Sequence, residues 1–245
     1  MKSHLCDYLK ELQLTWSLQH HEALAQEAAQ NGEAHASYLE RVLEGECHRR
    51  REIRIQRRLQ AARFPVLKTL DAFDWSWPKK IDRTHVMDLM RLAFLDTKTN
   101  VILLGGVGLG KSHIASAIGR QACLEGRCVL WTTAIEMVNA LIAAQAAQRL
   151  RQELKKYLAP ELLILDELGY LPIDKQGADL LFQVIGGRYE RGSILLTTNR
   201  TFKQWAGIFN NDTTLASAVL DRLLHHAQTL VIDGQSYRMK DRANP

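Results

Sequence analysis

The sequence predicts an α/β protein in which a five-stranded parallel sheet lies between helices, preceded by a small all-α domain. From residue 101 onward, short apolar runs alternate with longer segments of helical period. Strands that are apolar on both faces and are joined by helices are typical of a parallel sheet covered on both sides. Residues 1–64, in contrast, contain helical spacing of apolar residues and no strand-like run. A chain of 245 residues is long enough for one large core and a small additional domain.

The N-terminal domain, residues 1–64, is expected to contain three helices. Leucines at helical spacing mark the first two, and the third runs from about Glu33 past Arg58. Residues 65–100 are expected to form a linker and the entry to the core, because prolines interrupt regular structure there.

The core, residues 101–245, supplies the strands and the helices that join them. Apolar runs predict five strands, at residues 101–104, 128–131, 162–165, 194–196 and 229–232. Helical periodicity predicts three helices, at residues 112–124, 135–157 and 176–190. Because these helices lie between strands, the strands they connect are expected to run parallel.

Composition narrows the classes of protein to which the chain can belong. With 46% apolar and 24% charged residues it is typical of a globular protein. No signal peptide is evident, and no apolar run approaches the roughly 20 residues of a membrane span, so the cytoplasm is expected and a membrane partner is not. The four cysteines lack zinc-ligand spacing and are expected to be reduced thiols. His225 and His226 are interpreted as surface or structural residues, because no cysteine or carboxylate lies at ligand spacing.

The basic charge is concentrated in one segment. The chain has a formal net charge of +5, and residues 48–58 alone contain six arginines and one glutamate. On a helix, five of these arginines cover an arc of about 120°; they are Arg50, Arg51, Arg54, Arg57 and Arg58. A one-sided basic face suits the backbone of double-stranded DNA, and the absence of interleaved aromatic residues argues against stacking on single-stranded bases. A solvated face or an acidic protein partner is the alternative.

Residues 105–112, GGVGLGKS, match the phosphate-binding pattern G-x-x-x-x-G-K-[ST] between an apolar strand and a helix. Glycines allow backbone N–H groups to converge on phosphate oxygens, and the helix adds its positive end. Lys111 is expected to reach the β- and γ-phosphates of ATP, and the Ser112 hydroxyl to coordinate Mg²⁺. The expected ATP-contacting residues of the loop are Gly105, Gly106, Val107, Gly108, Leu109, Gly110, Lys111, Ser112 and His113. A glycine-rich turn without a ligand is the alternative.

Polar residues end two later apolar runs. Asp166 and Glu167 follow the run LLIL, where Asp166 is expected to contact ATP-bound Mg²⁺ and Glu167 to act as general base toward water. A Glu167 that only caps the next turn is the alternative. Asn199 follows the run SILLTT and is expected to position water beside the γ-phosphate, although asparagine is also common in turns.

These motifs, in this order, resemble an AAA+ ATPase of the initiator and helicase-loader group. More narrowly, they resemble the IstB family, the helper ATPases that bacterial insertion sequences encode beside their transposase. The resemblance extends over nearly the whole chain, and it includes YLERVLEGECHRRR near the N-terminus and LDRLLHH and SYRMKD near the C-terminus. These end segments favour the IstB family over the related DnaC-type loaders.

The resemblance implies roles that the residues alone do not assign. Arg222, in LDRLLHH, corresponds to an arginine finger that reaches the γ-phosphate bound by a neighbouring subunit, and Arg238 to a second sensor in its own subunit's ATP site. ATP sites completed between subunits imply a homo-oligomer. Arg149, Lys155 and Lys156 would face DNA, although their mixed-charge segment also fits a solvated helix face. The helical lid that many AAA+ proteins carry after the last strand is expected to be absent or vestigial.

The sequence therefore favours an ATPase that assembles on double-stranded DNA and recruits or stimulates a transposase. Its residues support ATP binding, hydrolysis and a basic helix, whereas the cognate transposase is implied by the resemblance alone. A DnaC-like loader of a replicative helicase, acting on single-stranded DNA, is the alternative. A small-molecule kinase or a DNA-binding scaffold without hydrolysis is a further alternative, but a kinase would leave Glu167 and Arg222 without a role.

Overall fold

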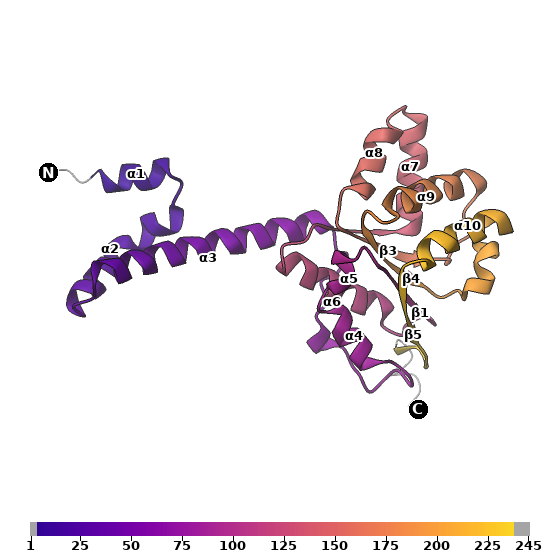
Figure 1. Cartoon of the computed structure of the whole chain (residues 1–245), viewed down its shortest axis with the longest axis horizontal. Helices are drawn as coiled ribbons and strands as arrows, with labels where there is room; N and C mark the ends of the chain where they lie inside the picture. The colour runs from indigo at the N-terminus through magenta and orange to yellow at the C-terminus, as the bar shows by residue number, and fades with distance from the viewer. Residues whose placement is uncertain (1–3, 238–245) are drawn as a thin grey trace. The chain divides into compact units, whose positions relative to one another are not determined.

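The structure, a computed structural model, describes residues 4–237. The chain divides into two compact units between Arg57 and Arg58, and Figure 1 shows the elements of both. The first unit contains α1 (Leu5–Glu11), α2 (Thr15–Gln30) and most of α3 (His35–Ala62), which confirms the expected all-α character of this part. Among residues 4–237, no helix is both long and apolar enough to cross a bilayer.

A buried carboxylate joins two helices of the first unit. Glu46, on α3, is 3% exposed and accepts hydrogen bonds from the backbone N–H groups of Trp16 (2.9 Å) and Ser17 (3.2 Å) at the start of α2. The guanidinium of Arg50 also donates to Glu46, at 3.1 Å. Burial by itself raises the pKa of Glu46, but the hydrogen bonds from Ser17, Arg50 and Trp16 outweigh it and hold the pKa below its ordinary value. The ionised carboxylate therefore fixes the start of α2 against α3.

The second unit is built around a parallel sheet with the strand order β2-β3-β4-β1-β5. Its strands are β1 (Asn100–Gly105), β2 (Val129–Thr133), β3 (Leu162–Leu168), β4 (Ser193–Thr198) and β5 (Ala227–Ile232). This confirms the predicted five-stranded parallel sheet. Since β4 lies between β3 and β1, the carboxyl ends of these three strands meet at one edge of the sheet.

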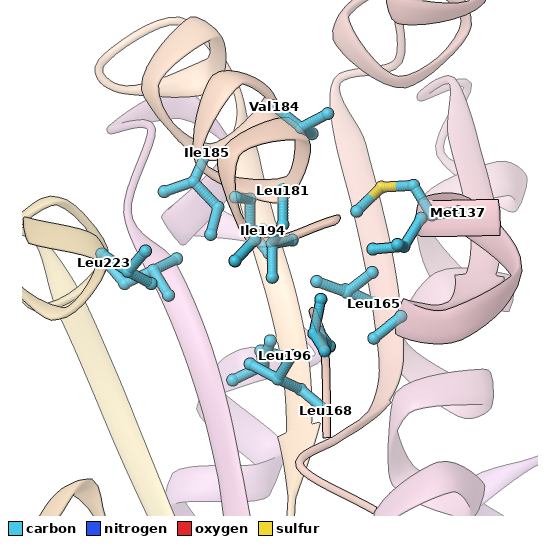
Figure 2. Packing of buried hydrophobic residues seen from close by; sticks show 14 of the residues in the cluster. Met137, Leu165, Leu168, Leu181, Val184, Ile185, Ile194, Leu196 and Leu223 are labelled. Carbon is cyan, nitrogen blue, oxygen red and sulfur yellow. The ribbon is translucent and has the colours of Figure 1, made fainter. Parts of the chain in front are cut away.

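Helices cover both faces of the sheet (Figure 1). One face packs against α7 (Ala134–Ala146), α8 (Leu150–Leu158), α9 (Lys175–Arg188) and α10 (Thr213–Leu224). The other packs against α4 (Arg83–Leu89), α5 (Ala93–Asp96) and α6 (Lys111–Leu124). Alternate residues of β3 enter the two cores, Leu163 on the first face and Leu162 on the second. Figure 2 shows the first core, where Met137 of α7 and Leu181 of α9 point toward Leu165 and Leu196.

The single helix predicted for residues 135–157 is wrong. The structure has two helices there, because Gln148 adopts a left-handed backbone with a φ of 55° and ends the run. Residues 65–100 contain the short 3₁₀ helix η1 (Leu70–Ala72) together with α4 and α5, and Phe94 and Leu95 are buried in the core. Two further elements, the 3₁₀ helix η2 (Phe202–Phe209) and α10, lie between β4 and β5 outside the predicted helices.

Replacement of Glu46 by Gln is expected to destabilise the first unit by about 1–3 kcal/mol, because a neutral amide cannot match the bonds that the buried carboxylate accepts. Hydrogen exchange of the α1, α2 and α3 peptides within the full chain measures this loss. Because the pKa of Glu46 is lowered, its contribution is complete above the ordinary value of 4.5 and is lost as the pH falls further. The difference between variant and parent should therefore shrink in acid.

Glu44→Gln is the matched control, since Glu44 lies on the same helix and is exposed, with His48 Nε2 3.8 Å from its carboxylate. If both variants exchanged as slowly as the parent at neutral pH, Glu46 would not be the residue that fixes α2.

Candidate nucleotide-binding site

The loop between β1 and α6 has the backbone that the glycine pattern predicts. β1 ends at Gly105, α6 begins at Lys111, and the glycines Gly108 and Gly110 between them have φ values of 75° and 86°. Gly110 is the N-cap of α6, and no side chain caps the first turn of this helix. The N–H groups of that turn, with the positive end of the helix dipole, can therefore bind an anion at this point.

Lys111 lies folded across the loop. Lys111 is 4% exposed, and its Nζ donates to the backbone oxygen of Gly106 at 2.7 Å. The loop, rather than solvent, therefore fixes the position of this ammonium group. The group can exchange a carbonyl oxygen for phosphate oxygens without a change in the course of α6.

The carboxylate of Asp166 joins three separate segments. Asp166 is 6% exposed, and its Oδ1 accepts hydrogen bonds from Ser112 Oγ on α6, at 3.0 Å, and from Thr197 Oγ1 on β4. The carboxylate and the Ser112 hydroxyl are hard oxygen donors, which is the ligand type that Mg²⁺ prefers. The hydrogen bond between Ser112 and Asp166 therefore holds together the two side chains that the predicted magnesium site requires.

A β-bulge separates Glu167 from Asp166. The register between β3 and β4 shifts between Leu165 and Leu168, and Glu167 has a left-handed φ of 62°. Its backbone N–H donates to Thr197 Oγ1 at 3.0 Å, while its side chain is exposed and lines the cavity described below. Since a bulge re-aims one side chain out of the alternation, adjacent acids can face different surroundings here. Asp166 is buried, and Glu167 faces the cavity.

A cavity of about 530 Å³ lies over the loop. The loop and Glu167 form one side of it, and the other side is aromatic, with Phe73, Trp77, Tyr170 and Tyr237. The C-terminal end of the described chain closes this wall, because Tyr237 N donates to Gly108 O at 2.9 Å and packs edge-on against Trp77 at 5.6 Å. The volume lies within the range of small-molecule sites, roughly 300–1,000 Å³.

Sequence reasoning did not assign Tyr170 or Tyr237 to this cavity. Tyr170 follows the acidic pair and Tyr237 lies in the SYRMKD segment, but only the fold brings them to the loop. His113, the last residue of the predicted loop set, also lines the cavity and packs edge-on against Phe73 at 5.3 Å.

Asn199 follows β4, beside the carboxyl ends of β1 and β3. Its Oδ1 is buried and accepts no hydrogen bond from any residue in 4–237. Asn199 is not among the residues that line the cavity. An acceptor in this condition can take a hydrogen bond from water, which is the property that the predicted water-positioning role requires.

Arg222 does not line the cavity. It lies in the last turn of α10, and its guanidinium stacks over the ring of Phe182 on α9 at 4.1 Å. Among residues 4–237 no carboxylate forms an ion pair with it. Arg238, the predicted second sensor, lies outside the described residues.

The predicted DNA-contacting residues divide into bound and exposed side chains. In the first unit all four arginines are exposed, but Arg50 pairs with Glu46 and donates to the carbonyl oxygens of Leu12 and Gln13, whereas Arg51, Arg54 and Arg57 form no ion pair among residues 4–237. In the second unit Arg58 is half-buried, Lys156 pairs with Glu153 at 2.8 Å, and Arg149 and Lys155 are exposed. The exposed arginines of α3 are thus the largest group of these side chains that can meet a phosphate backbone.

Comparison with known proteins gives extensive matches. The family described as IstB-like ATP binding protein matches residues 7–245. The ATP-binding protein of insertion sequence IS5376 from Geobacillus stearothermophilus is 36% identical over 99% of this chain and 96% of its own. The ATP-binding protein of insertion sequence IS21 from Pseudomonas aeruginosa is 40% identical over 96% of this chain and 88% of its own.

Solved structures with a similar fold come from replication proteins. DnaI superposes with a TM-score of 0.56 at 18% identity, over 72% of this chain and 92% of DnaI. AMPPCP-bound DnaA from Aquifex aeolicus gives a TM-score of 0.56 at 19% identity, over 73% of this chain and 54% of DnaA. At these identities the likeness concerns the fold alone, and it agrees with the P-loop core described above.

Gly110→Ala is expected to weaken ATP binding by more than about ten-fold, because the left-handed backbone at this residue strains any side chain by roughly 1–3 kcal/mol. A Cβ at Gly110 would also lie 2.5 Å from Cε2 of Phe73, so the cavity wall must move. Titration with a fluorescent ATP analogue measures the affinity. Gly106→Ala is the control, since its Cβ would lie 3.5 Å from Leu109 Cδ1, an ordinary contact. Equal affinities for the two variants would contradict this view of the loop.

Proposed function

Because the chain belongs to the IstB-like family of insertion-sequence ATP-binding proteins, we propose that it is a DNA-dependent ATPase. In this proposal it assembles on double-stranded DNA in its ATP-bound state and recruits or stimulates the transposase of its insertion sequence. The separation of the two adjacent carboxylates, Asp166 and Glu167, carries the proposal of hydrolysis. One is buried among hydroxyl groups, and the other faces the cavity above the phosphate loop.

The proposed reaction divides among residues that the fold brings to one edge of the sheet. The loop N–H groups and Lys111 hold the β- and γ-phosphates, while Ser112 and Asp166 would hold Mg²⁺, which neutralises charge on the phosphates. Glu167 takes a proton from water as the water oxygen bonds to the γ-phosphorus and the bond to the oxygen of ADP breaks. Asn199 would orient that water through its Oδ1, which accepts no hydrogen bond from residues 4–237; because Asn199 does not line the cavity, its side chain must turn toward the water to do so.

We assign Arg222 to the site of a neighbouring copy. It does not line the cavity of its own chain. Its guanidinium stacks on Phe182 and forms no ion pair with a carboxylate among residues 4–237. A second chain would bring this charge to the γ-phosphate, where it stabilises the transition state. Arg238 would act within its own chain's site. Hydrolysis then depends on assembly, and ATP acts between subunits.

The DNA contact is assigned to α3 in the first unit. Arg51, Arg54 and Arg57 are exposed there, and helical geometry places them on one side. A phosphate backbone is recognised by such charges without sequence readout. The ATP-binding proteins of IS5376 and IS21, which are similar over nearly the whole chain, are named for insertion sequences, and this supports a transposase as the partner.

Glu167→Gln is expected to bind ATP with unchanged affinity and to hydrolyse it about 10²–10⁴-fold more slowly, because the amide cannot accept the proton of the attacking water. Steady-state phosphate release measures turnover without DNA, with single-stranded DNA and with a long duplex. Glu125→Gln is the matched control, since Glu125 is exposed at the end of α6 and does not line the cavity.

The DNA dependence of the parent protein decides between partners. Stimulation by duplex DNA agrees with the proposal, whereas stimulation confined to single strands would favour a helicase loader. Turnover of Glu167→Gln equal to that of Glu125→Gln would contradict the role of Glu167.

Joint replacement of Arg51, Arg54 and Arg57 by Ala is expected to weaken duplex binding. Each lost phosphate contact should also reduce the slope of log K against log salt by about 0.9. Fluorescence anisotropy at several salt concentrations measures both quantities. Arg191→Ala, an exposed arginine of the second unit, serves as the control for loss of charge. An unchanged salt slope in the triple variant would show that α3 does not contact the phosphate backbone.

A further inference from the structure

A cluster of metal-ligating side chains lies in the second unit, and none of its members lines the nucleotide cavity. It consists of Glu190, which follows α9, and of His225 and His226, which lie between α10 and β5. All three are exposed, and one potential ligand atom from each lies within 4.8 Å of the others. Glu190 lies in another segment of the sequence from these histidines, but the fold brings its carboxylate to them. Their interpretation as surface residues is confirmed, but a carboxylate lies beside them.

The distances within the cluster suit a shared cation. His226 Nε2 and Glu190 Oε1 are 3.5 Å apart, which exceeds a normal N–H···O hydrogen bond. Zinc binds imidazole nitrogen and carboxylate oxygen at about 2.0–2.2 Å, so ligand atoms on a tetrahedral shell lie about 3.3–3.6 Å apart. The ring centroids of His225 and His226 are 4.2 Å apart, so the two imidazoles meet at the same place.

Tyr189 fixes the orientation of one imidazole. Its hydroxyl forms a hydrogen bond with Nδ1 of His225 at 2.8 Å. In the tautomer with a proton on Nδ1, His225 donates to the tyrosine oxygen and leaves Nε2 unprotonated for a metal. A partner of this kind behind a ligating histidine is typical of metal sites.

The backbone that carries these side chains is held on both sides. Arg188, at the end of α9, is buried and donates to the carbonyl oxygens of Tyr157 (2.7 Å) and Ser193 (2.8 Å). On the other side the carbonyl oxygen of His226 accepts from Asn100 N at 2.7 Å. The ligands therefore project from fixed points of the fold rather than from long loops, which reduces the ordering that a metal would impose.

We propose that Glu190, His225 and His226 form a binding site for a transition-metal ion of the zinc type, with water completing its shell. Imidazole ligands favour Zn²⁺ over Mg²⁺ or Ca²⁺, which prefer oxygen. The bound ion ties the end of α9 to the junction of α10 and β5. Arg222 stacks on Phe182 between these same two helices, so the ion also secures the support of that arginine. This inference goes beyond the proposed function, because it requires neither ATP nor DNA.

Zn²⁺ binding to the untagged full-length chain, without nucleotide, tests the site through competition with a chromogenic chelator. The parent protein is expected to bind one Zn²⁺ that His226→Ala and Glu190→Gln bind more than about ten-fold more weakly. Zn²⁺ should also raise the melting temperature of the parent but not of either variant. Two variants are used because a shared loss through both ligands is not explained by a local effect of one substitution.

His48→Ala is the matched control. His48 is also an exposed histidine with a carboxylate nearby, Glu44 at 3.8 Å, but it belongs to no group of three ligands among residues 4–237. The control should keep the full Zn²⁺ affinity and the shift in melting temperature. Parent-like Zn²⁺ binding by His226→Ala and Glu190→Gln, or the same loss in His48→Ala, would overturn the proposal. Absence of Zn²⁺ binding by the parent at micromolar concentration would also overturn it.

Discussion

The carboxylate of Asp166 is the group on which the rest of the nucleotide site depends. It accepts hydrogen bonds from Ser112 at the start of α6 and from Thr197 on β4, and it lies on β3. Three segments that are far apart in the sequence are thereby fixed at one edge of the sheet. Both hydrogen bonds matter, because a buried carboxylate without hydrogen-bond partners is costly in free energy. The phosphate loop, the acidic pair and Asn199 take their relative places from this arrangement.

A single bulge gives the two adjacent acids different tasks. Without the extra residue in β3, the alternation of side chains would direct Glu167 toward one face of the sheet rather than into the cavity. The left-handed backbone of Glu167 is strained for a residue with a side chain, and strain of this kind is common where a group must be presented for chemistry. Arg222 lies on α10 and does not line the cavity of its own chain. In the proposed function Arg222 of a second copy supplies its charge to the site, so ATP hydrolysis depends on assembly.

Much of the fold and of the site follows from local patterns in the sequence. Apolar runs located all five strands, because burial on both faces leaves a continuous signal, and GGVGLGKS located the loop because its geometry demands glycine. The break at Gln148 escaped prediction, since neither glycine nor proline marks it, alanine-rich sequence precedes it, and good helix formers such as Leu, Arg, Glu and Lys follow it. The bulge at Glu167 has no signal of its own. Contacts across long separations also escaped, as between Tyr237 and Gly108, because only the completed fold creates them.

The same limit applies to charge. The helical wheel placed Arg50 with the other arginines, but the wheel cannot show that Glu46 and two backbone carbonyl groups already engage it. Likewise, spacing alone separated His225 from Glu190, which lies in another segment. Periodicity therefore identifies which side chains share a face, and tertiary packing decides which of them remain available.

A mixing experiment tests most directly whether the ATP site is completed between copies of the chain. Lys111→Ala removes the phosphate-binding ammonium and Arg222→Ala removes the charge assigned to the neighbour, so each variant alone should hydrolyse ATP poorly. When the two are mixed on duplex DNA, some sites combine Lys111 of one chain with Arg222 of the next. Phosphate release by the mixture is therefore predicted to exceed the sum of the separate rates. A mixture no faster than that sum, with both variants still assembling on DNA, would contradict a site shared between subunits.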